Sequence, residues 1–200
     1  KGMRKAYCLV EWRISEGMLK GLNFNDKMIS WIMNGITTTS YSISLNGSTF
    51  GYFKGMRGLR QGDPMSPLLI TVCLEYFTRI MNYTTTHYDF QFHPMCNRLK
   101  LSHLAFADDL LIFCKGNANS IKVVMKSLNK LSETSGLRLN NDKSDLYMNG
   151  VSDCDAQSLL NLIGFRKGEF PFRYLGIPIS YKRISVAEGN VISEKLVSKI

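Results

Sequence analysis

Residues 104–113, with the sequence LAFADDLLIF, place two adjacent carboxylates, Asp108 and Asp109, between two short apolar runs. This pattern predicts two antiparallel strands joined by a tight turn, with the carboxylates at its tip. An ionised carboxylate costs several kcal/mol to bury unless it is paired or bound to a metal, and two neighbours repel each other. A divalent cation removes both penalties, and oxygen ligands on a rigid hairpin suit magnesium. The alternative is turn chemistry alone, because Asp is itself favoured in tight turns.

A second informative stretch covers residues 54–67, with the sequence KGMRGLRQGDPMSP. Its three glycines and three cations predict a flexible basic loop whose backbone a ligand can approach closely. The Asp-Pro and Ser-Pro pairs at 63–64 and 66–67 are typical of helix starts, and we expect a largely buried helix over 68–81. A basic loop that leads into a helix N-terminus suits contact with phosphate or sugar. A purely structural loop between a hairpin and a helix is the alternative.

The rest of the chain alternates helical and strand-like patterns. The sequence predicts an extended segment over 1–7, helices over 9–21, 25–35 and 120–135, a hairpin over 37–53 that turns at Asn46-Gly47, extended segments over 137–139 and 146–148, and a hairpin over 170–179 that bends at Gly176. This order favours an α+β fold, in which helices back an antiparallel sheet.

Composition narrows the class of protein. The 200 residues are 44% hydrophobic and 20% charged, which is typical of a folded domain, and the net charge of +9 suits either a polyanionic partner or an ordinary basic protein. Five widely spaced cysteines without a CxxC pair indicate reduced thiols, so we expect an intracellular protein, nuclear or cytoplasmic. No apolar run approaches the ~20 residues of a membrane span. The chain lacks an initial Met and stops in a helix-like stretch, so we expect a fragment.

Taken together, these stretches resemble the palm domain of a reverse transcriptase from a non-LTR (LINE-type) retrotransposon, of the plant kind. The motifs follow the family's order: RKAY at 4–7 with VEW at 10–12, GLRQGDPMSP at 58–67, FADD at 106–109, GL at 136–137 with Asn140 and KS at 143–144, and YLG at 174–176. The resemblance implies a polymerase palm over 1–165 without the fingers upstream, and a primer-grip-like hairpin with the start of the thumb connection over 166–200. An intron-encoded maturase, which shares the acidic hairpin, is the alternative family. The sequence of residues 60–67 favours the retrotransposon family.

The resemblance also implies a chemistry and a set of roles. The family synthesises DNA from dNTPs on an RNA template and a DNA primer, with two magnesium ions. Tyr7 matches the bulky aromatic that excludes a ribose 2′-hydroxyl, and Lys143 the lysine that protonates the leaving pyrophosphate. The implied sites are the metal-binding and catalytic Asp108 and Asp109 with the catalytic Lys143, the nucleotide- and template-binding Tyr7, Arg57, Arg60, Gln61 and Gly62, and the primer grip Tyr174, Leu175 and Gly176.

The first motif departs from the family at its acids. The family places a metal-binding Asp five residues before the aromatic, where this chain has Gly2, and a second directly after it, where this chain has Cys8. A two-metal site needs a bridging carboxylate, so the resemblance implies a loss of orders of magnitude in rate. An active polymerase and a nucleic-acid-binding remnant without chemistry are the competing hypotheses. Without fingers, we expect the apolar face near Ile43, Leu45 and Phe50 to be partly uncovered.

Overall fold

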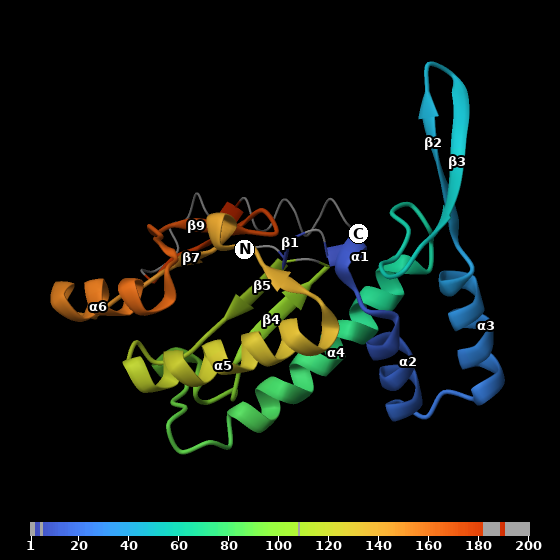
Figure 1. Ribbon diagram of the computed structural model, residues 1–200. Helices are drawn as coiled ribbons and strands as arrows, with labels where there is room; N and C mark the ends of the chain where they lie inside the picture. Colours follow the sequence, from blue (N-terminus) through green and yellow to red (C-terminus); the bar gives the residue numbers. More distant parts are fainter. Residues whose placement is uncertain (1–2, 5, 108, 182–188, 191–200) are drawn as a thin grey trace. The chain divides into compact units, whose positions relative to one another are not determined.

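The computed structural model describes residues 3–4, 6–107, 109–181 and 189–190 (Figure 1). The predicted ligand Asp108 and the altered position Gly2 lie outside the described residues. The chain divides into two compact units, Lys1–Lys143 and Ser144–Ile200. The domain boundary that we expect at residue 165 stays a prediction.

Helices and strands are interleaved along the chain, which agrees with the predicted α+β class. The first unit contains β1 (Met3–Arg4), α1 (Ala6–Leu9), α2 (Trp12–Gly21), α3 (Asp26–Thr37), β2 (Ser40–Leu45), β3 (Ser48–Lys54), α4 (Ser66–Thr84), η1 (Pro94–Cys96), β4 (His103–Phe106), β5 (Asp109–Ile112), α5 (Ala118–Ser135), β6 (Arg138–Leu139) and η2 (Asn141–Lys143). The second contains β7 (Asp145–Leu146), α6 (Asp153–Ile163), β8 (Arg166–Lys167), β9 (Phe172–Tyr174) and β10 (Ile177–Ile179).

The core of the first unit is built around α4, the long helix that lies beside α5 in Figure 1. Its apolar residues recur every three or four positions, so they share one face of the helix. Phe77 and Met81 are completely buried, and they pack in one cluster with Leu128 and Leu131 of α5. A short hydrogen bond of 2.6 Å between the hydroxyls of Thr84 and Ser127 satisfies two buried polar groups between these helices.

Three predicted helix boundaries are wrong. The helix that we expected to begin at residue 9 begins at Trp12, with Glu11 as its N-cap. Ala6–Leu9 is helical, although we expected extended chain through Tyr7; a backbone hydrogen bond from the distant Leu59 N–H to the Tyr7 carbonyl holds this turn in place. The helix capped by Asn25 continues past Gly35 to Thr37. There the hydroxyls of Thr37 and Thr38 donate to carbonyls one turn earlier, at 2.8 and 2.6 Å, so the last turn does not need a glycine stop.

Helix α6 is an element that the sequence analysis missed. Ser152 caps it reciprocally, because its hydroxyl accepts from the Asp155 backbone N–H at 3.2 Å and donates to the Asp155 carboxylate at 2.7 Å. Gly164 closes it with φ of +72°. A Ser three residues before an acid, with a Gly at the far end, is a known helix signature, so the sequence did contain the signal.

The strands do not join into the single antiparallel sheet that we predicted. Among the described residues they form five two-stranded sheets, of which β7–β8 is parallel and the other four are antiparallel. β1 and β6 pair through only two residues each, so they offer few ladder hydrogen bonds to connect the longer hairpins. The order of helices and hairpins along the chain therefore agrees with the prediction. The prediction that the strands join in one sheet is wrong for the described residues.

The hairpin of β2 and β3 confirms the strongest turn prediction. Asn46 and Gly47 have φ of +50° and +80°, the pair of positive angles that a type I′ turn requires. Every residue of both strands is exposed, and Figure 1 shows the hairpin extending away from α3. The prediction that Ile43, Leu45 and Phe50 are partly uncovered is confirmed, since each is more than half exposed.

Candidate functional site

The acidic hairpin forms as predicted. β4 and β5 pair so that Phe106 faces Asp109, and Ala107, directly after β4, has φ of +51°. Asp109 is half-buried at the first position of β5, and the next residue, Leu110, is buried in the core. The hairpin therefore carries the Asp109 carboxylate at its turn end while its body is anchored.

His103 attaches the base of this hairpin to α4. Its two ring nitrogens form hydrogen bonds with the hydroxyls of Thr78, at 3.1 Å, and Ser102, at 2.9 Å. The ring also meets the Phe77 ring edge to face, with 5.2 Å between centroids. Burial lowers the pKa of His103, and the Glu75 carboxylate opposes this shift more weakly, so the neutral ring is favoured.

The basic loop is fixed at its centre rather than flexible, which corrects our expectation. The backbone N–H of Gly58 donates to the Val10 carbonyl at 2.8 Å, and that of Leu59 donates to the Tyr7 carbonyl at 2.6 Å. The Trp12 indole N–H donates to the Gly58 carbonyl at 2.7 Å. Gly58 has φ of +88°, and a Cβ there would lie 2.8 Å from the carbonyl oxygen of Cys8. Two motifs fifty residues apart in sequence are thus locked together by backbone contacts.

The predicted nucleotide- and template-binding residues occupy different environments around this contact. Tyr7 is half-buried and packs against the core, whereas Arg60, Gln61 and Gly62 are exposed. Arg57 forms an ion pair with Glu11 at 3.6 Å, with both side chains partly exposed, so this pair contributes little stability. The structure therefore brings Tyr7 and the centre of the loop together.

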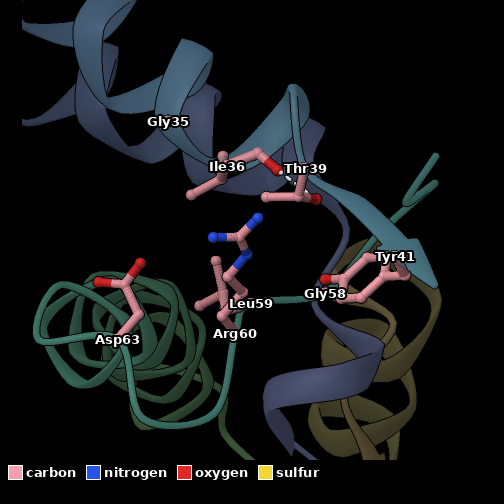
Figure 2. A pocket seen from close by; sticks show the side chains of 8 residues that line it. All are labelled: Gly35, Ile36, Thr39, Tyr41, Gly58, Leu59, Arg60 and Asp63. Atoms are coloured by element: carbon pink, nitrogen blue, oxygen red, sulfur yellow. Dashed lines mark hydrogen bonds between the residues drawn. The ribbon is translucent and has the colours of Figure 1, made fainter. Parts of the chain in front are cut away.

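Arg60 lies in a small pocket between α3 and the loop (Figure 2). In Figure 2 its guanidinium points toward Ile36 and Thr39, with Asp63 on the other side of the pocket. Among the described residues the guanidinium takes part in no ion pair. The pocket is lined by Gly35, Ile36, Thr39, Tyr41, Gly58, Leu59, Arg60 and Asp63.

The end of α5 completes the arrangement around the first motif. The Glu11 N–H donates to the Ser135 carbonyl at 2.9 Å, and a Cβ on Gly136 would collide with the carbonyl oxygen of Leu9. Lys143 is exposed at the end of η2. The predicted site did not include Trp12 or Gly136. The available signal for Trp12 was its single N–H, which needs an acceptor when the ring is buried.

The predicted primer-grip residues lie in the second unit. Leu175 and Gly176, with φ of +51° and +77°, form the turn between β9 and β10, so the predicted bend at Gly176 is confirmed. The Tyr147 ring stacks on Phe172 of the same unit, with 3.9 Å between centroids. A gripping role for Tyr174 and its neighbours stays a prediction.

The described residues contain no group of three or more His, Cys, Asp or Glu side chains that could hold a metal ion. Asp109 supplies one carboxylate, and Asp108 lies outside the described residues. Cys8, at the position of a family acid, is an exposed free thiol on α1. A thiol is a soft ligand that matches magnesium poorly, so this position does not replace the missing acid.

Comparison with known proteins identifies the family. Residues 3–179 match the family described as reverse transcriptase (RNA-dependent DNA polymerase). Over 110 residues, 55% of this chain, the sequence is 31% identical to the retrovirus-related Pol polyprotein from type-1 retrotransposable element R2 of Popillia japonica. The aligned region spans 17% of that relative's length.

The chain therefore belongs to the reverse transcriptase family. Within this family it is a reverse transcriptase domain of the non-LTR, LINE type. The family implies a polymerase that depends on a divalent metal and uses a nucleic-acid template with nucleotide substrates. None of the described helices is long and apolar enough to span a membrane.

Proposed function

We propose that this palm domain belongs to a polymerase that copies an RNA template into DNA, and that the present copy is catalytically impaired. The observation that carries the reaction is the family match over residues 3–179, which includes the acidic hairpin. The proposed impairment rests on Gly2 and Cys8, which stand at two positions where the family has Asp.

We propose magnesium as the metal, with Asp108 and Asp109 as its ligands. Magnesium prefers oxygen donors in octahedral geometry, and it would offset the charge of the nucleotide phosphates when bound. Gly2 has no donor atom, and the Cys8 thiol is a poor magnesium ligand. The donor set therefore lacks the carboxylate that would bridge two ions, and the residues present do not complete a two-metal site.

The remaining proposed roles follow from charge and position. The exposed guanidinium of Arg60 suits a phosphate contact, and Arg57 reaches the same polyanion once it leaves its weak pair with Glu11. The hydrogen bond from Leu59 to the Tyr7 carbonyl holds Tyr7 beside the loop, where its ring would exclude a ribose 2′-hydroxyl. These residues support binding and orientation of a nucleotide or template.

Proton transfer and primer contact complete the proposal. Lys143 is exposed and cationic, as a general acid for leaving pyrophosphate requires. Tyr174, Leu175 and Gly176 form a tight turn that suits contact with a primer strand. Gln61 and Gly62, on the exposed part of the loop, suit contact with the template.

A binding module without chemistry is the second candidate function. The net charge of +9 and the exposed loop cations favour it, because they attract any polyanion. Such a module would bind nucleic acid with an affinity that falls steeply as salt rises, and it would not extend a primer.

Primer extension on an RNA template with magnesium tests the proposal. We expect no extension by the native chain, extension by the Gly2→Asp/Cys8→Asp variant, and none by the matched Gly2→Asn/Cys8→Asn control, which has the shape but not the charge. Replacing Asp108 by Asn in the active variant should abolish its extension. If the native chain extends the primer, and replacing its Asp108 by Asn abolishes that extension, the proposal that this copy is impaired is wrong.

Metal binding gives a second readout that does not require turnover. Manganese, followed by its electron paramagnetic resonance signal, should bind the Asp double variant at least about tenfold more tightly than the Asn control, since each added carboxylate favours the cation. Equal affinity in the two variants would contradict the proposed placement of the metal at this motif.

A further inference from the structure

The two faces of the β2–β3 hairpin differ sharply in chemistry. In the observed register Ile43 pairs with Phe50 and Tyr41 with Phe53. An irregularity between these two pairs puts one extra residue into β3, so Phe53 lies on the same face as Phe50, together with Tyr41, Ile43 and Leu45. The opposite face carries the paired hydroxyls of Ser44 and Thr49. On the apolar face, exposure of these side chains ranges from 37% to 61%. A soluble domain rarely leaves such a face open without a ligand or partner.

The hairpin and the loop that follows it are basic, although two acids lie next to the loop: Glu11 pairs with Arg57 at 3.6 Å, and Asp63 lines the pocket of Arg60. Residues 27–62 contain no Asp or Glu and four cations, namely Lys27, Lys54, Arg57 and Arg60. Lys54 ends β3 and pairs with Ser40 at the base of the hairpin, and two arginines follow within six residues. A segment with exposed aromatic rings, cations and no acids is complementary to a polyanion that also carries flat rings.

The apolar face continues into the pocket of Arg60. Tyr41 stacks on Phe53, with 5.8 Å between ring centroids and 28° between planes, and it also lines the pocket that contains Arg60. Figure 2 shows the Tyr41 ring and the Arg60 guanidinium on neighbouring walls of this pocket. A strand laid along the hairpin would thus lead directly to the loop that follows it.

We propose that the apolar face of the β2–β3 hairpin binds single-stranded nucleic acid, with bases stacked on Phe50 and Phe53 and a phosphate near Arg60. The inference rests on the proposed function and deepens it, because it assigns a path to the unpaired part of the template. Stacking tolerates any base sequence, which suits an enzyme that copies a whole strand. A duplex is a poorer ligand for this face, since its bases are already stacked on each other.

Binding of a short fluorescent oligouridine, measured by anisotropy, tests the inference. The Phe50→Leu/Phe53→Leu variant keeps the face apolar but removes both rings. We expect its dissociation constant to rise roughly fivefold or more, as for other lost base-aromatic stacks. The control Ser44→Ala/Thr49→Ala changes the opposite face and should bind like the native chain. Cross-links from 4-thiouridine in the same RNA should map to residues 50–54.

The outcomes separate this inference from the proposed function. Unchanged affinity of the Leu variant, with cross-links elsewhere, would overturn the hairpin site and leave the polymerase proposal standing. Failure of the native chain to bind any RNA would count against both. The chain could instead associate with itself through this face. Self-association that persists in the Leu variant but is lost in Phe50→Ser/Phe53→Ser would identify the face as a protein interface and overturn the inference.

Discussion

Gly136 ends α5 with φ of +73°, and its Cα lies directly against the Leu9 carbonyl. Gly136→Ala therefore adds a backbone strain of roughly 1 kcal/mol and a collision with main-chain atoms that cannot move freely. We expect a loss of about 2–4 kcal/mol in the free energy of unfolding, measured by chemical denaturation.

Gly164 provides the matched control for this substitution. It ends α6 with φ of +72°, and its backbone N–H donates the same kind of cap hydrogen bond, to the Leu160 carbonyl, but a Cβ there would meet nothing within 4 Å. Gly164→Ala should cost only about 1 kcal/mol, the backbone term alone. Equal losses in the two variants would mean that the close approach of Gly136 to Leu9 contributes nothing.

His103 makes the stability of the acidic hairpin depend on pH. Burial lowers the pKa of His103 below its ordinary value of 6.5, so the folded state favours the neutral ring. The stabilisation is complete above the unfolded pKa and is lost as the pH falls through the folded pKa. We expect denaturation midpoints to decrease below about pH 6.5. The decrease should be smaller in His103→Gln, and an identical pH profile in that variant would contradict the assignment.

At the scale of elements, the β2–β3 hairpin is held by its turn rather than by the core. Gly47→Val places a β-branched residue at φ of +80°, which that side chain strongly disfavours. We expect faster amide hydrogen exchange over residues 40–54, with a change in global stability below about 0.5 kcal/mol. Asn46→Asp is the control, because Asp tolerates the left-handed conformation. If the free energy of global unfolding falls as much as the local stability measured by hydrogen exchange over residues 40–54, the hairpin is part of the core.

At the scale of the whole first unit, stability depends on α4. Phe77 is completely buried at the centre of the core, and Phe77→Ala should cost about 3–5 kcal/mol in the free energy of unfolding. Leu68 lies on the same helix but is 68% exposed, so Leu68→Ala should cost well under about 1 kcal/mol. Similar losses in both variants would contradict the assigned core face of α4.

Local patterns predicted much of the fold. The turn at Asn46 and Gly47, the glycine stop after Ser135 and the acidic hairpin all depend on residues close together in sequence, and all three are confirmed. The extension of α3 past Gly35 was missed because threonine hydroxyls, rather than a glycine, satisfy its last carbonyls. The absence of one continuous sheet was missed because strand pairing is decided by distant segments.

The sequence by itself determined the family, since the motifs between residues 4 and 176 all lie within the region 3–179 that matches it. It also determined the donor chemistry of the first motif, because no fold can give Gly2 a carboxylate. Only the tertiary structure decided that the basic loop is rigid at Gly58, where hydrogen bonds to Tyr7 and Val10 fix it. Only the tertiary structure decided that the strands of the described residues stay in five separate pairs instead of one sheet. Both depend on contacts between residues far apart in the chain, and local pattern carries no information on such contacts.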